Sequence, residues 1–412
     1  MNDASAPQNA PEILVVSPFA LHAGHYWNNA EELAIALMKA GQRVTILVSD
    51  TTARPPAAEV SSLITTSPSW WRRLLRFAFA NDKITRWGSG LRRPFEMIGV
   101  LFTASRFIKK RNRSVIIHFI DGTFLVLFAW QLFARQPCVY NLMGGTEPLQ
   151  PIRFLSNPFR SLKRMITLAL LARCIRIGLI ELCAETEAVR RDWAKIVANH
   201  VHRIPYAISP VTNGISRKQA RTDLHLDEND TILLLFGIQR EGKDISTVIR
   251  AAKQISPQPF LLFVGKHLSG PNAKELVRDF EFTDCRIIDR FVTEEESALY
   301  FAACDAVVLP YAEGYDRGSG VLLEACQYLR PVIATDTGHL REFVREHGTG
   351  CLFHFGDAES LGRCMKTVAH LTLDERRVVE NTISQTVHHY SWERIVHQYV
   401  ALYRSLINKL SV

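Results

Sequence analysis

The sequence is poor in cysteine, and its cysteines do not form a ligand-like pattern. Eight cysteines are scattered over 412 residues, without a Cys-x-x-Cys pair. This spacing argues against a disulfide framework and against a zinc site, and it predicts reduced thiols in a cytoplasm. The sequence also lacks an Asp-x-Asp motif that could bind a divalent cation. We therefore expect neither a metal nor another cofactor.

Signals for secretion and for membrane spanning are also missing. The first twelve residues, MNDASAPQNAPE, contain no basic stretch followed by an apolar core, so we expect no signal peptide. The most apolar window, 115–134, nearly matches a bilayer in length, but it contains Asp121, whose charge would be costly there. We predict a buried strand from Val115 to Ile120, a turn at Asp121 and a helix from Thr123 instead.

The composition is that of a globular protein with more than one core. Hydrophobic residues make up 47% of the chain and charged residues 22%, which argues against a disordered chain. A length of 412 residues is too great for one ordinary core and suits two α/β domains.

The stretch 305–338 carries the strongest pattern in the chain. A β-branched run, Ala306 to Leu309, predicts a buried parallel strand. A loop rich in glycine, serine and acids follows, then a helix from Val321 and a second buried strand from Pro331. The free N–H groups and the dipole of a helix N-terminus favour an anion in such a loop, and at Ser319 and Gly320 the backbone can approach it closely. The alternative is an ordinary βαβ unit with a glycine-rich loop.

The same stretch resembles the donor site of retaining glycosyltransferases of the GT-B architecture, and more narrowly of family 4. That family has two acids separated by seven residues, before a strand that reads PV-x-AT. Glu324 is the second acid. Asp316 has the spacing of the first acid, whereas Glu313 stands three residues earlier in the familiar Glu-Gly setting. The resemblance implies that Glu324 binds the ribose hydroxyls and that Asp316 or Glu313 orients the sugar.

A second loop, 237–244, follows the apolar run from Thr231 to Phe236 and reads GIQREGKD. It resembles the family's Gly-x-x-Arg-x-x-Lys-Gly loop, with Asp244 in place of the last glycine. The resemblance places Arg240 and Lys243 on the donor diphosphate, where two cations would stabilise the leaving group without a metal. The alternative is a solvated basic loop. The implied donor contacts are Gly24, Gly237, Arg240, Lys243, Val292, Glu313, Glu324 and the backbone of Ser319, Gly320 and Val321.

The N-terminal half resembles the acceptor side of the family. Only Gly24 stands in the loop after the first strand, where the family has two glycines. His118 matches a family histidine or is a hydrogen-bonded core residue. Asp121 is the candidate for contacting the acceptor hydroxyl, and Met143 replaces an acceptor-side histidine.

These features predict an α/β protein of two facing Rossmann-like domains with parallel sheets and an interdomain cleft. We expect an acceptor-side domain at 1–210, a nucleotide-sugar donor domain at 211–387, and a C-terminal helix at 388–412 that crosses back to the first domain. The expected catalytic residues are Asp316, Glu324 and Asp121.

The segment 69–113 differs from the rest of the chain in charge. It holds twelve lysines and arginines, two acids, and three of the seven tryptophans, whereas the whole chain has a net charge of only +8. A second basic run without acids lies at 153–176. Basic residues interleaved with tryptophan favour a peripheral helix on an anionic membrane. A solvated or nucleic-acid-binding face is the alternative, but no nucleic-acid-binding module surrounds it.

The resemblance therefore implies a retaining glycosyltransferase that uses a UDP- or GDP-sugar. The predicted acceptor is a saccharide or lipid-linked saccharide of an envelope or exopolysaccharide pathway, reached from the inner face of the membrane. The rival is a catalytically degenerate GT-B protein that binds nucleotide or membrane. An epimerase on the same architecture is a third, weaker option.

Overall fold

The computed structural model describes residues 11–17, 26–49, 60, 62, 64–70, 82–111, 114–120, 124–142, 158–197, 200–211, 214–315 and 318–410. The chain divides into two compact units. The first contains Met1–Pro205 and Trp392–Val412, and the second contains Tyr206–Ser391. The last helix of the chain thus belongs to the same unit as the N-terminal half.

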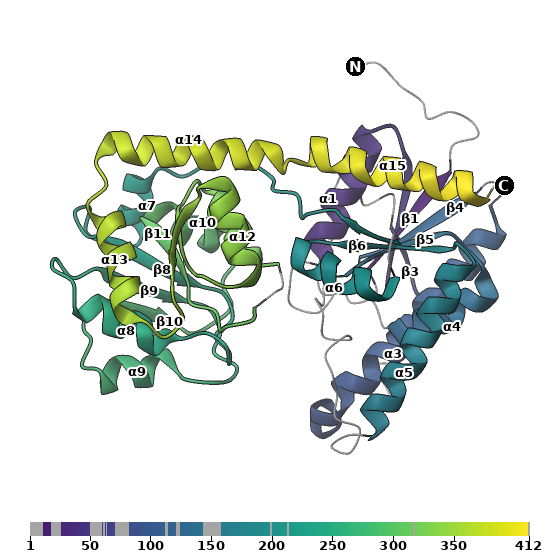
Figure 1. Cartoon of the computed structure of the whole chain (residues 1–412), viewed down its shortest axis with the longest axis horizontal. Coiled ribbons are helices and arrows are strands. Elements are labelled where there is room, and N and C mark those ends of the chain that lie inside the picture. The colour runs from purple at the N-terminus through teal and green to yellow at the C-terminus, as the bar shows by residue number, and fades with distance from the viewer. Residues whose placement is uncertain are drawn as a thin grey trace. The chain divides into compact units, whose positions relative to one another are not determined.

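A parallel sheet forms the centre of the first unit, with seven strands in the part of the chain that is described (Figure 1). Its order is β3-β2-β1-β4-β5-β6-β7, and every neighbouring pair is parallel. The four central strands are fully buried, as expected of a parallel sheet covered on both faces. The strands are β1 (Glu12–Ser17), β2 (Arg43–Val48), β3 (Ile64–Thr66), β4 (Val115–Phe119), β5 (Cys138–Asn141), β6 (Ile180–Ala184) and β7 (Val201–Arg203).

Helices pack on this sheet from both ends of the sequence. The last helix, α15, contacts α1, and the indole N–H of Trp392 donates a hydrogen bond to Glu32 at 3.0 Å. This bond ties the C-terminal helix to the first unit. The helices of the unit are α1 (Tyr26–Lys39), α3 (Asp82–Lys109), α4 (Phe124–Ala134), α5 (Pro158–Arg176), α6 (Glu187–Val197) and α15 (Trp392–Leu410).

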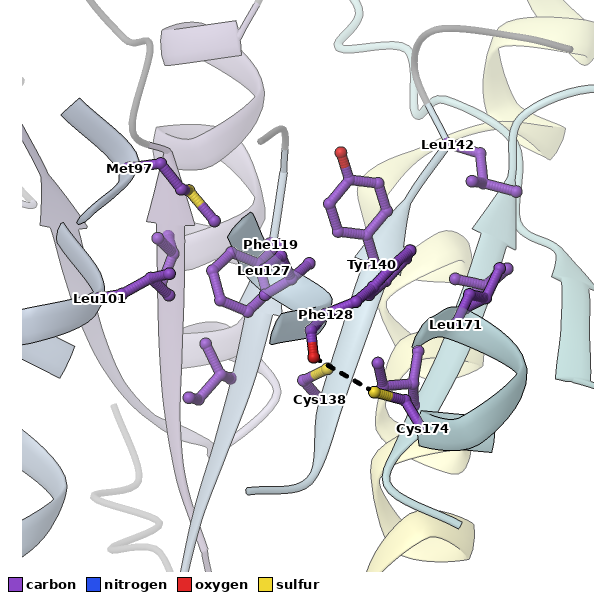
Figure 2. Close-up of a cluster of buried hydrophobic side chains, with 14 of the residues drawn as sticks. Met97, Leu101, Phe119, Leu127, Phe128, Cys138, Tyr140, Leu142, Leu171 and Cys174 are labelled. Atoms are coloured by element: carbon purple, nitrogen blue, oxygen red, sulfur yellow. Dashed lines mark hydrogen bonds between the residues drawn. The ribbon is translucent and has the colours of Figure 1, made fainter. Parts of the chain in front are cut away.

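The core of the first unit joins the sheet to α3, α4 and α5. Figure 2 shows Phe119 and Tyr140 from the sheet among side chains of these three helices. The helices contribute Met97, Leu101, Leu127, Phe128, Leu171 and Cys174, all buried. Because the inner faces of α3 and α5 are used in this core, their outer faces lie away from it.

The window 115–134 folds as the sequence predicts, with a buried strand, β4, and then a helix, α4. The predicted turn at Asp121 lies outside the described residues, as does most of the tryptophan-arginine cluster at 70–80. Among the helices that are described, none is both long enough and apolar enough to cross a membrane.

The second unit is built on another parallel sheet, with six strands over the described residues. Its order is β10-β9-β8-β11-β12-β13, so the chain reverses direction across the sheet between β8 and β11. The predicted fold class, α/β with two Rossmann-like parallel sheets, is confirmed. The strands are β8 (Ile232–Phe236), β9 (Phe260–Val264), β10 (Cys285–Ile288), β11 (Ala306–Leu309), β12 (Val332–Thr335) and β13 (Gly350–Phe353).

The helices of the second unit have clear start signals. Thr293 caps α10 in a capping box with Glu296, and three glutamates occupy its first turn, where they complement the helix dipole. Thr372 and Glu375 form a second capping box on α14. The helices are α7 (Arg217–Asp223), α8 (Ile245–Lys253), α9 (Ala273–Asp279), α10 (Glu294–Ala303), α11 (Gly320–Gln327), α12 (Gly338–His347), α13 (Ala358–Ala369) and α14 (Leu373–His389).

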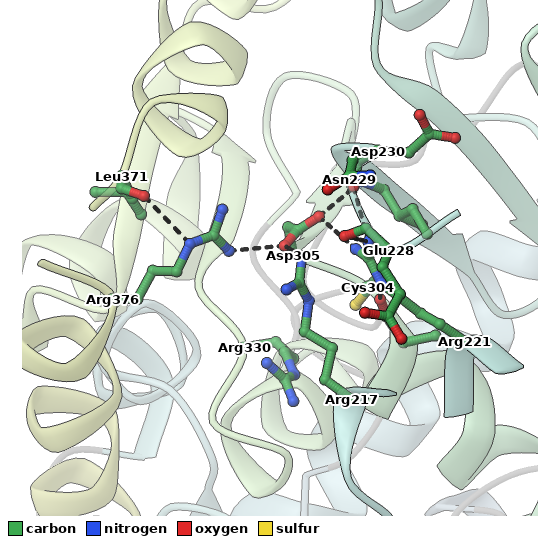
Figure 3. Close-up of polar contacts among 12 residues, drawn as sticks. Arg217, Arg221, Glu228, Asn229, Asp230, Cys304, Asp305, Arg330, Leu371 and Arg376 are labelled. Carbon is green, nitrogen blue, oxygen red and sulfur yellow. Dashed lines mark hydrogen bonds and ion pairs between the residues drawn. The ribbon is translucent and has the colours of Figure 1, made fainter. Parts of the chain in front are cut away.

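Asp305, at the amino end of β11, holds several of these elements together (Figure 3). Its buried carboxylate pairs with Arg217 at 2.5 Å, Arg221 at 2.8 Å and Arg376 at 2.7 Å, and it also accepts the backbone N–H of Ile232. The guanidinium of Arg221 is itself buried and donates to four backbone carbonyls. The cluster joins α7, β8, β11 and α14, at the end of the sheet opposite the carboxyl ends of its strands.

The prediction that all eight cysteines are reduced thiols is wrong for one pair. A disulfide joins Cys351 on β13 to Cys364 on α13, with Cα atoms 5.7 Å apart. The other six cysteines are free. The sequence spacing does not reveal this pair, because it is the packing of α13 on β13 that brings the two residues together.

Candidate active site

Two loops meet where β8 and β11 end. The backbone N–H of Asp244 donates to Pro310 and that of Ala312 donates to Gly242, both at 2.8 Å. A backbone bridge also joins Lys243 to Tyr311. These bonds fix the loop 237–244 against the segment that follows β11. Because the strand order reverses between β8 and β11, this is the position where open α/β sheets bind ligands.

Gly237 lets the first loop pass close to its neighbours. Its φ is +84°, a conformation that favours glycine, and a Cβ there would lie 3.3 Å from Val321 on α11. Gly265, after β9, approaches even more closely, because a Cβ on it would lie 2.2 Å from the carbonyl oxygen of Gly237. The loop and the start of α11 are therefore in direct contact.

Lys243 is half-buried within this loop. Its ammonium group donates to the carbonyl of Phe236 at 2.8 Å and lies 5.9 Å from the centre of the Tyr311 ring. Burial, together with the nearby charge of Arg240, lowers the pKa of Lys243 from 10.5 to about 8. Within the described residues, the ammonium group donates to this one carbonyl, and a cation in such a place is well suited to an anionic ligand.

Asp244 has a role that differs from the glycine it replaces. Its carboxylate accepts the backbone N–H of Thr247 at 3.1 Å and caps α8. It also accepts the hydroxyls of Ser246 and Thr247. The backbone at Asp244 has a negative φ of −87°, so the substitution causes no strain and secures the start of the helix.

The N-terminus of α11 faces the same loops. Ser319 is buried and caps the helix, accepting the backbone N–H of Leu322 at 3.2 Å, and its hydroxyl lies 3.1 Å from that of Tyr311. The helix begins at Gly320, one residue earlier than predicted. The N–H groups of Gly320 and Val321, ahead of the capped Leu322, have no partner within the helix, so they are available to a ligand.

Glu324 lies one turn into α11. One oxygen of its carboxyl group, Oε2, is buried and has no hydrogen-bond partner among the described residues. Burial, with a smaller contribution from the charge of Glu294, raises the pKa of Glu324 from 4.5 to about 7. An unpaired buried carboxyl group is costly, and it indicates a place for a donor from a ligand.

Some of the remaining predicted residues are described by the structure, and the others lie outside the described residues. Arg240 and Glu313 are exposed on the two loops, and Val292 is half-buried just before the cap of α10. The structure thus brings Gly237, Lys243, Ser319, Gly320 and Val321 together directly. Asp316, Asp121, Gly24 and Met143 lie outside the described residues.

His118 is a core residue. It is fully buried, and its ring nitrogens lie 3.1 Å from the side-chain oxygen of Asn141 and 2.5 Å from the hydroxyl of Tyr403. Burial lowers the pKa of His118 to about 4, so the imidazole is neutral at pH 7. Of the two interpretations given for His118 from the sequence, the position fits a hydrogen-bonded core residue.

Sequence reasoning missed three residues of the site. Tyr311 links the two loops. Burial is the main cause of its raised pKa, and the charges of Arg240 and Glu324 also influence that pKa. Gln239 is buried, and its amide nitrogen has no partner in the described part of the chain. Gly265 supplies the close contact with Gly237. Gln239 and Tyr311 follow the apolar runs that end at Phe236 and Leu309, and Gly265 directly follows β9.

Fold and geometry together define a GT-B-type protein whose second unit offers cations, helix amides and a carboxyl group around one loop pair. Residues 216–385 match the model of the family glycosyl transferases group 1. The match covers most of the second unit.

Relatives whose names state an activity match part of the chain. A GDP-mannose:glycolipid 4-beta-D-mannosyltransferase of Xanthomonas campestris pv. campestris is 27% identical over 172 residues, which cover 40% of this chain and 48% of that protein. The chain thus spans about half the length of the curated relatives it matches.

Two solved structures match nearly the whole chain. A glycosyltransferase of Rickettsia africae ESF-5 has a TM-score of 0.68 at 17% identity and covers 97% of this chain and 99% of its own. A sucrose-phosphate synthase of Thermosynechococcus elongatus has a TM-score of 0.67 at 18% identity, covering 97% and 100%. At these identities the matches show the fold alone.

Proposed function

We propose that this chain transfers a sugar from a nucleoside diphosphate sugar to an acceptor hydroxyl. The observation that carries the proposal is the buried, unpaired carboxyl oxygen of Glu324. It lies one turn after Val321, which packs against the loop that holds Lys243. A nucleoside diphosphate sugar offers a partner to both side chains. Its diphosphate can bind the ammonium group of Lys243, and its ribose hydroxyls can donate to the carboxylate of Glu324.

Each residue has a role in this proposal. Lys243 and Arg240, with the first amides of α11, hold the diphosphate and stabilise its charge as it leaves, without a divalent metal. Glu324 accepts from the ribose hydroxyls, and the backbone at Val292 meets the base. Asp316 or Glu313 orients the sugar, Gly24 contributes to donor binding, and Asp121 contacts the acceptor hydroxyl.

The proposed chemistry retains the anomeric configuration. The bond between the anomeric carbon and the phosphate oxygen breaks, and its electron pair leaves with the phosphate. The acceptor oxygen bonds to the same face of that carbon, and its proton passes to the leaving phosphate. This proposal rests on the resemblance of the 305–338 stretch to family 4.

Inversion is a second candidate, favoured by the name of the Xanthomonas relative, which specifies a β-mannosyl product. A β product from an α-linked donor would require attack on the opposite face and a general base. The anomeric configuration of the product, read by NMR, separates the two mechanisms.

The proposed acceptor is a saccharide on a lipid, reached by a peripheral protein at the inner face of a membrane. The name of the Xanthomonas relative includes a glycolipid acceptor and a GDP-mannose donor, which supports this acceptor class. The two basic runs of the first unit, at 69–113 and 153–176, would suit an anionic membrane surface.

A thermal-shift screen of UDP- and GDP-sugars tests the donor site, since a ligand at a hundred times its dissociation constant adds about 2.7 kcal/mol of stability. Transfer to a lipid-linked acceptor then tests the activity. Donor binding without transfer or hydrolysis would favour a degenerate protein. Conversion of the donor sugar without an acceptor would favour an epimerase.

A further inference from the structure

The outer faces of α3 and α5 carry apolar side chains that the core of the first unit does not cover. Of the ten large hydrophobic side chains exposed in the described part of this unit, seven belong to α3, α4 and α5. Six of these have exposed fractions between 44% and 63%, and Phe133 on α4 is 88% exposed. The seven are Phe95, Ile98, Phe102, Phe133, Leu162, Met165 and Ile166.

The exposed residues form one stripe on each long helix. Phe95, Ile98 and Phe102 are spaced by three and four residues on α3, and the stripe continues through Arg106 to Lys109. The guanidinium of Arg106 lies over the ring of Phe102, at 5.1 Å. On α5, Leu162 and Ile166 begin a stripe that continues at the same spacing to exposed Arg173 and Arg176.

Both stripes have the same direction relative to the sheet. Each helix is followed directly by a strand, so its C-terminal, basic end lies near the sheet and its apolar part lies further out. Figure 1 shows both α3 and α5 extending well past the sheet of their unit. With a rise of about 1.5 Å per residue, Arg106 lies roughly 12 Å beyond Ile98 along α3, and Arg173 lies roughly 10 Å beyond Ile166 along α5. Lys163 and Arg164 stand beside the apolar residues at the start of the α5 stripe.

The charge on these helices favours an anionic partner. Over 94–111, 124–136 and 161–176 the chain has nine lysines and arginines and one acid, Glu96, which is buried. Apolar side chains that are followed by cations further along the helix, toward the sheet, match the boundary between acyl chains and lipid phosphates. Interfacial helices insert into this boundary by about 5–10 Å. A soluble protein partner would not require cations so uniformly.

We propose that the apolar stripes of α3 and α5 insert into the surface of an anionic phospholipid bilayer, with Arg106 and Arg173 at the phosphates. This inference locates the membrane contact of the proposed function on α3 and α5. The binding surface itself is argued from exposure and charge, and only the reason for binding a membrane rests on the proposed function. Insertion here would place the first unit at the membrane, where a lipid-linked acceptor resides.

The test is co-sedimentation of the full chain with vesicles of phosphatidylcholine alone or mixed with phosphatidylglycerol. We expect wild-type protein to bind the mixed vesicles, more weakly but still measurably at high salt, because salt screens the charges and not the apolar contact. The pair Ile98→Glu and Met165→Glu should lower the partition coefficient at least about tenfold at both salt concentrations. Arg106→Glu with Arg173→Glu should lower it mainly at low salt.

Two controls are matched to these variants. Val378→Glu changes an apolar residue that is 64% exposed on α14 of the second unit, and Arg404→Glu changes an exposed arginine on α15 of the first. Both should bind vesicles like the wild type. All variants should keep wild-type thermal stability and donor binding, so a loss of binding reports the surface and not the fold.

Wild-type protein that stays in the supernatant with mixed vesicles at low salt would overturn the proposal. So would a dimer that the Ile98 and Met165 substitutions dissociate while vesicle binding is absent, because the stripes would then pair two copies of the chain. Vesicle binding without any sugar transfer would reject the proposed function and leave this surface in place.

Discussion

Replacing Glu324 with glutamine tests the donor site most directly. The carboxyl group has one unpaired buried oxygen, and its pKa is raised from 4.5 to about 7. Glutamine keeps the shape and one acceptor oxygen but cannot ionise. The variant therefore separates the charge of Glu324 from its packing.

The stability of the empty protein should change with pH through this group. Because the folded pKa is the higher one, the folded state binds more protons than the unfolded state between pH 4.5 and about 7. Stability from this group is thus fully present below pH 4.5 and is lost as the pH rises through 7. A rise of this size corresponds to about 3 kcal/mol. Glu324→Gln should remove the loss, so it should be more stable than the wild type at pH 8 but not at pH 4.5.

Donor binding should show the opposite trend in the same range. If the ionised carboxylate accepts ribose hydroxyls, only that form binds well, so affinity at pH 6 should be about tenfold below its plateau. Lys243, with its pKa of about 8, must be protonated to hold the diphosphate, so affinity should fall again above pH 8. Glu324→Gln should weaken binding about tenfold to a hundredfold, lose the acidic limb and keep the alkaline one.

Calorimetric titration with a nucleoside diphosphate sugar provides the assay, since its phosphates do not titrate in this range. In buffers of different ionisation enthalpy, wild-type binding near pH 6.5 should release protons, and Glu324→Gln binding should release none. Glu275→Gln, at an exposed acid on α9, is the control and should match the wild type. An acidic limb that persists in Glu324→Gln would show that another group titrates, and the assignment of Glu324 to the ribose would fail.

Three further predictions, with five substitutions, address the rest of the second unit. Lys243→Ala and Arg240→Ala should each lower turnover by about a hundredfold, as loss of a charge-stabilising donor does; wild-type rates in both would remove this loop from the site. Asp316→Asn should reduce donor use more than Glu313→Gln, because Asp316 has the spacing to Glu324; the reverse order, measured as kcat/KM, would assign the role to Glu313. Asp305→Asn should destabilise the protein by about 3–5 kcal/mol in denaturant titrations, because it leaves buried Arg221 without its carboxylate. Unchanged stability there would show that the backbone carbonyls around Arg221 suffice.

The strand and loop pattern of the donor stretch could be predicted from its residues. The run from Ala306 to Leu309 is β11, as expected, and α11 begins within one residue of the predicted start. Apolar β-branched runs ended by Pro310 and glycine leave few alternatives to a buried strand and a turn. Local sequence determines these features, and so a single sequence is enough.

The electrostatic state of the site could not be predicted in the same way. The pKa of Glu324 depends on burial by its surroundings and on Glu294, thirty residues earlier. The partners of Asp305 are also far from it in the sequence, since Arg221 precedes it by 84 residues. Such values depend on which side chains the fold brings together, and no periodicity or motif records that information.

Lys243 and Glu324 have pKa values shifted in opposite directions for one physical reason. Burial favours the neutral form of each group, which lowers the pKa of the amine and raises that of the carboxyl group. A site with two such groups lacks the ligand that would stabilise their charges. A diphosphate restores the favourable environment of the ammonium, and ribose hydroxyls restore that of the carboxylate. Because each side chain binds a different part of one molecule, an intact donor stabilises both charges, whereas a phosphate or a nucleoside alone stabilises one.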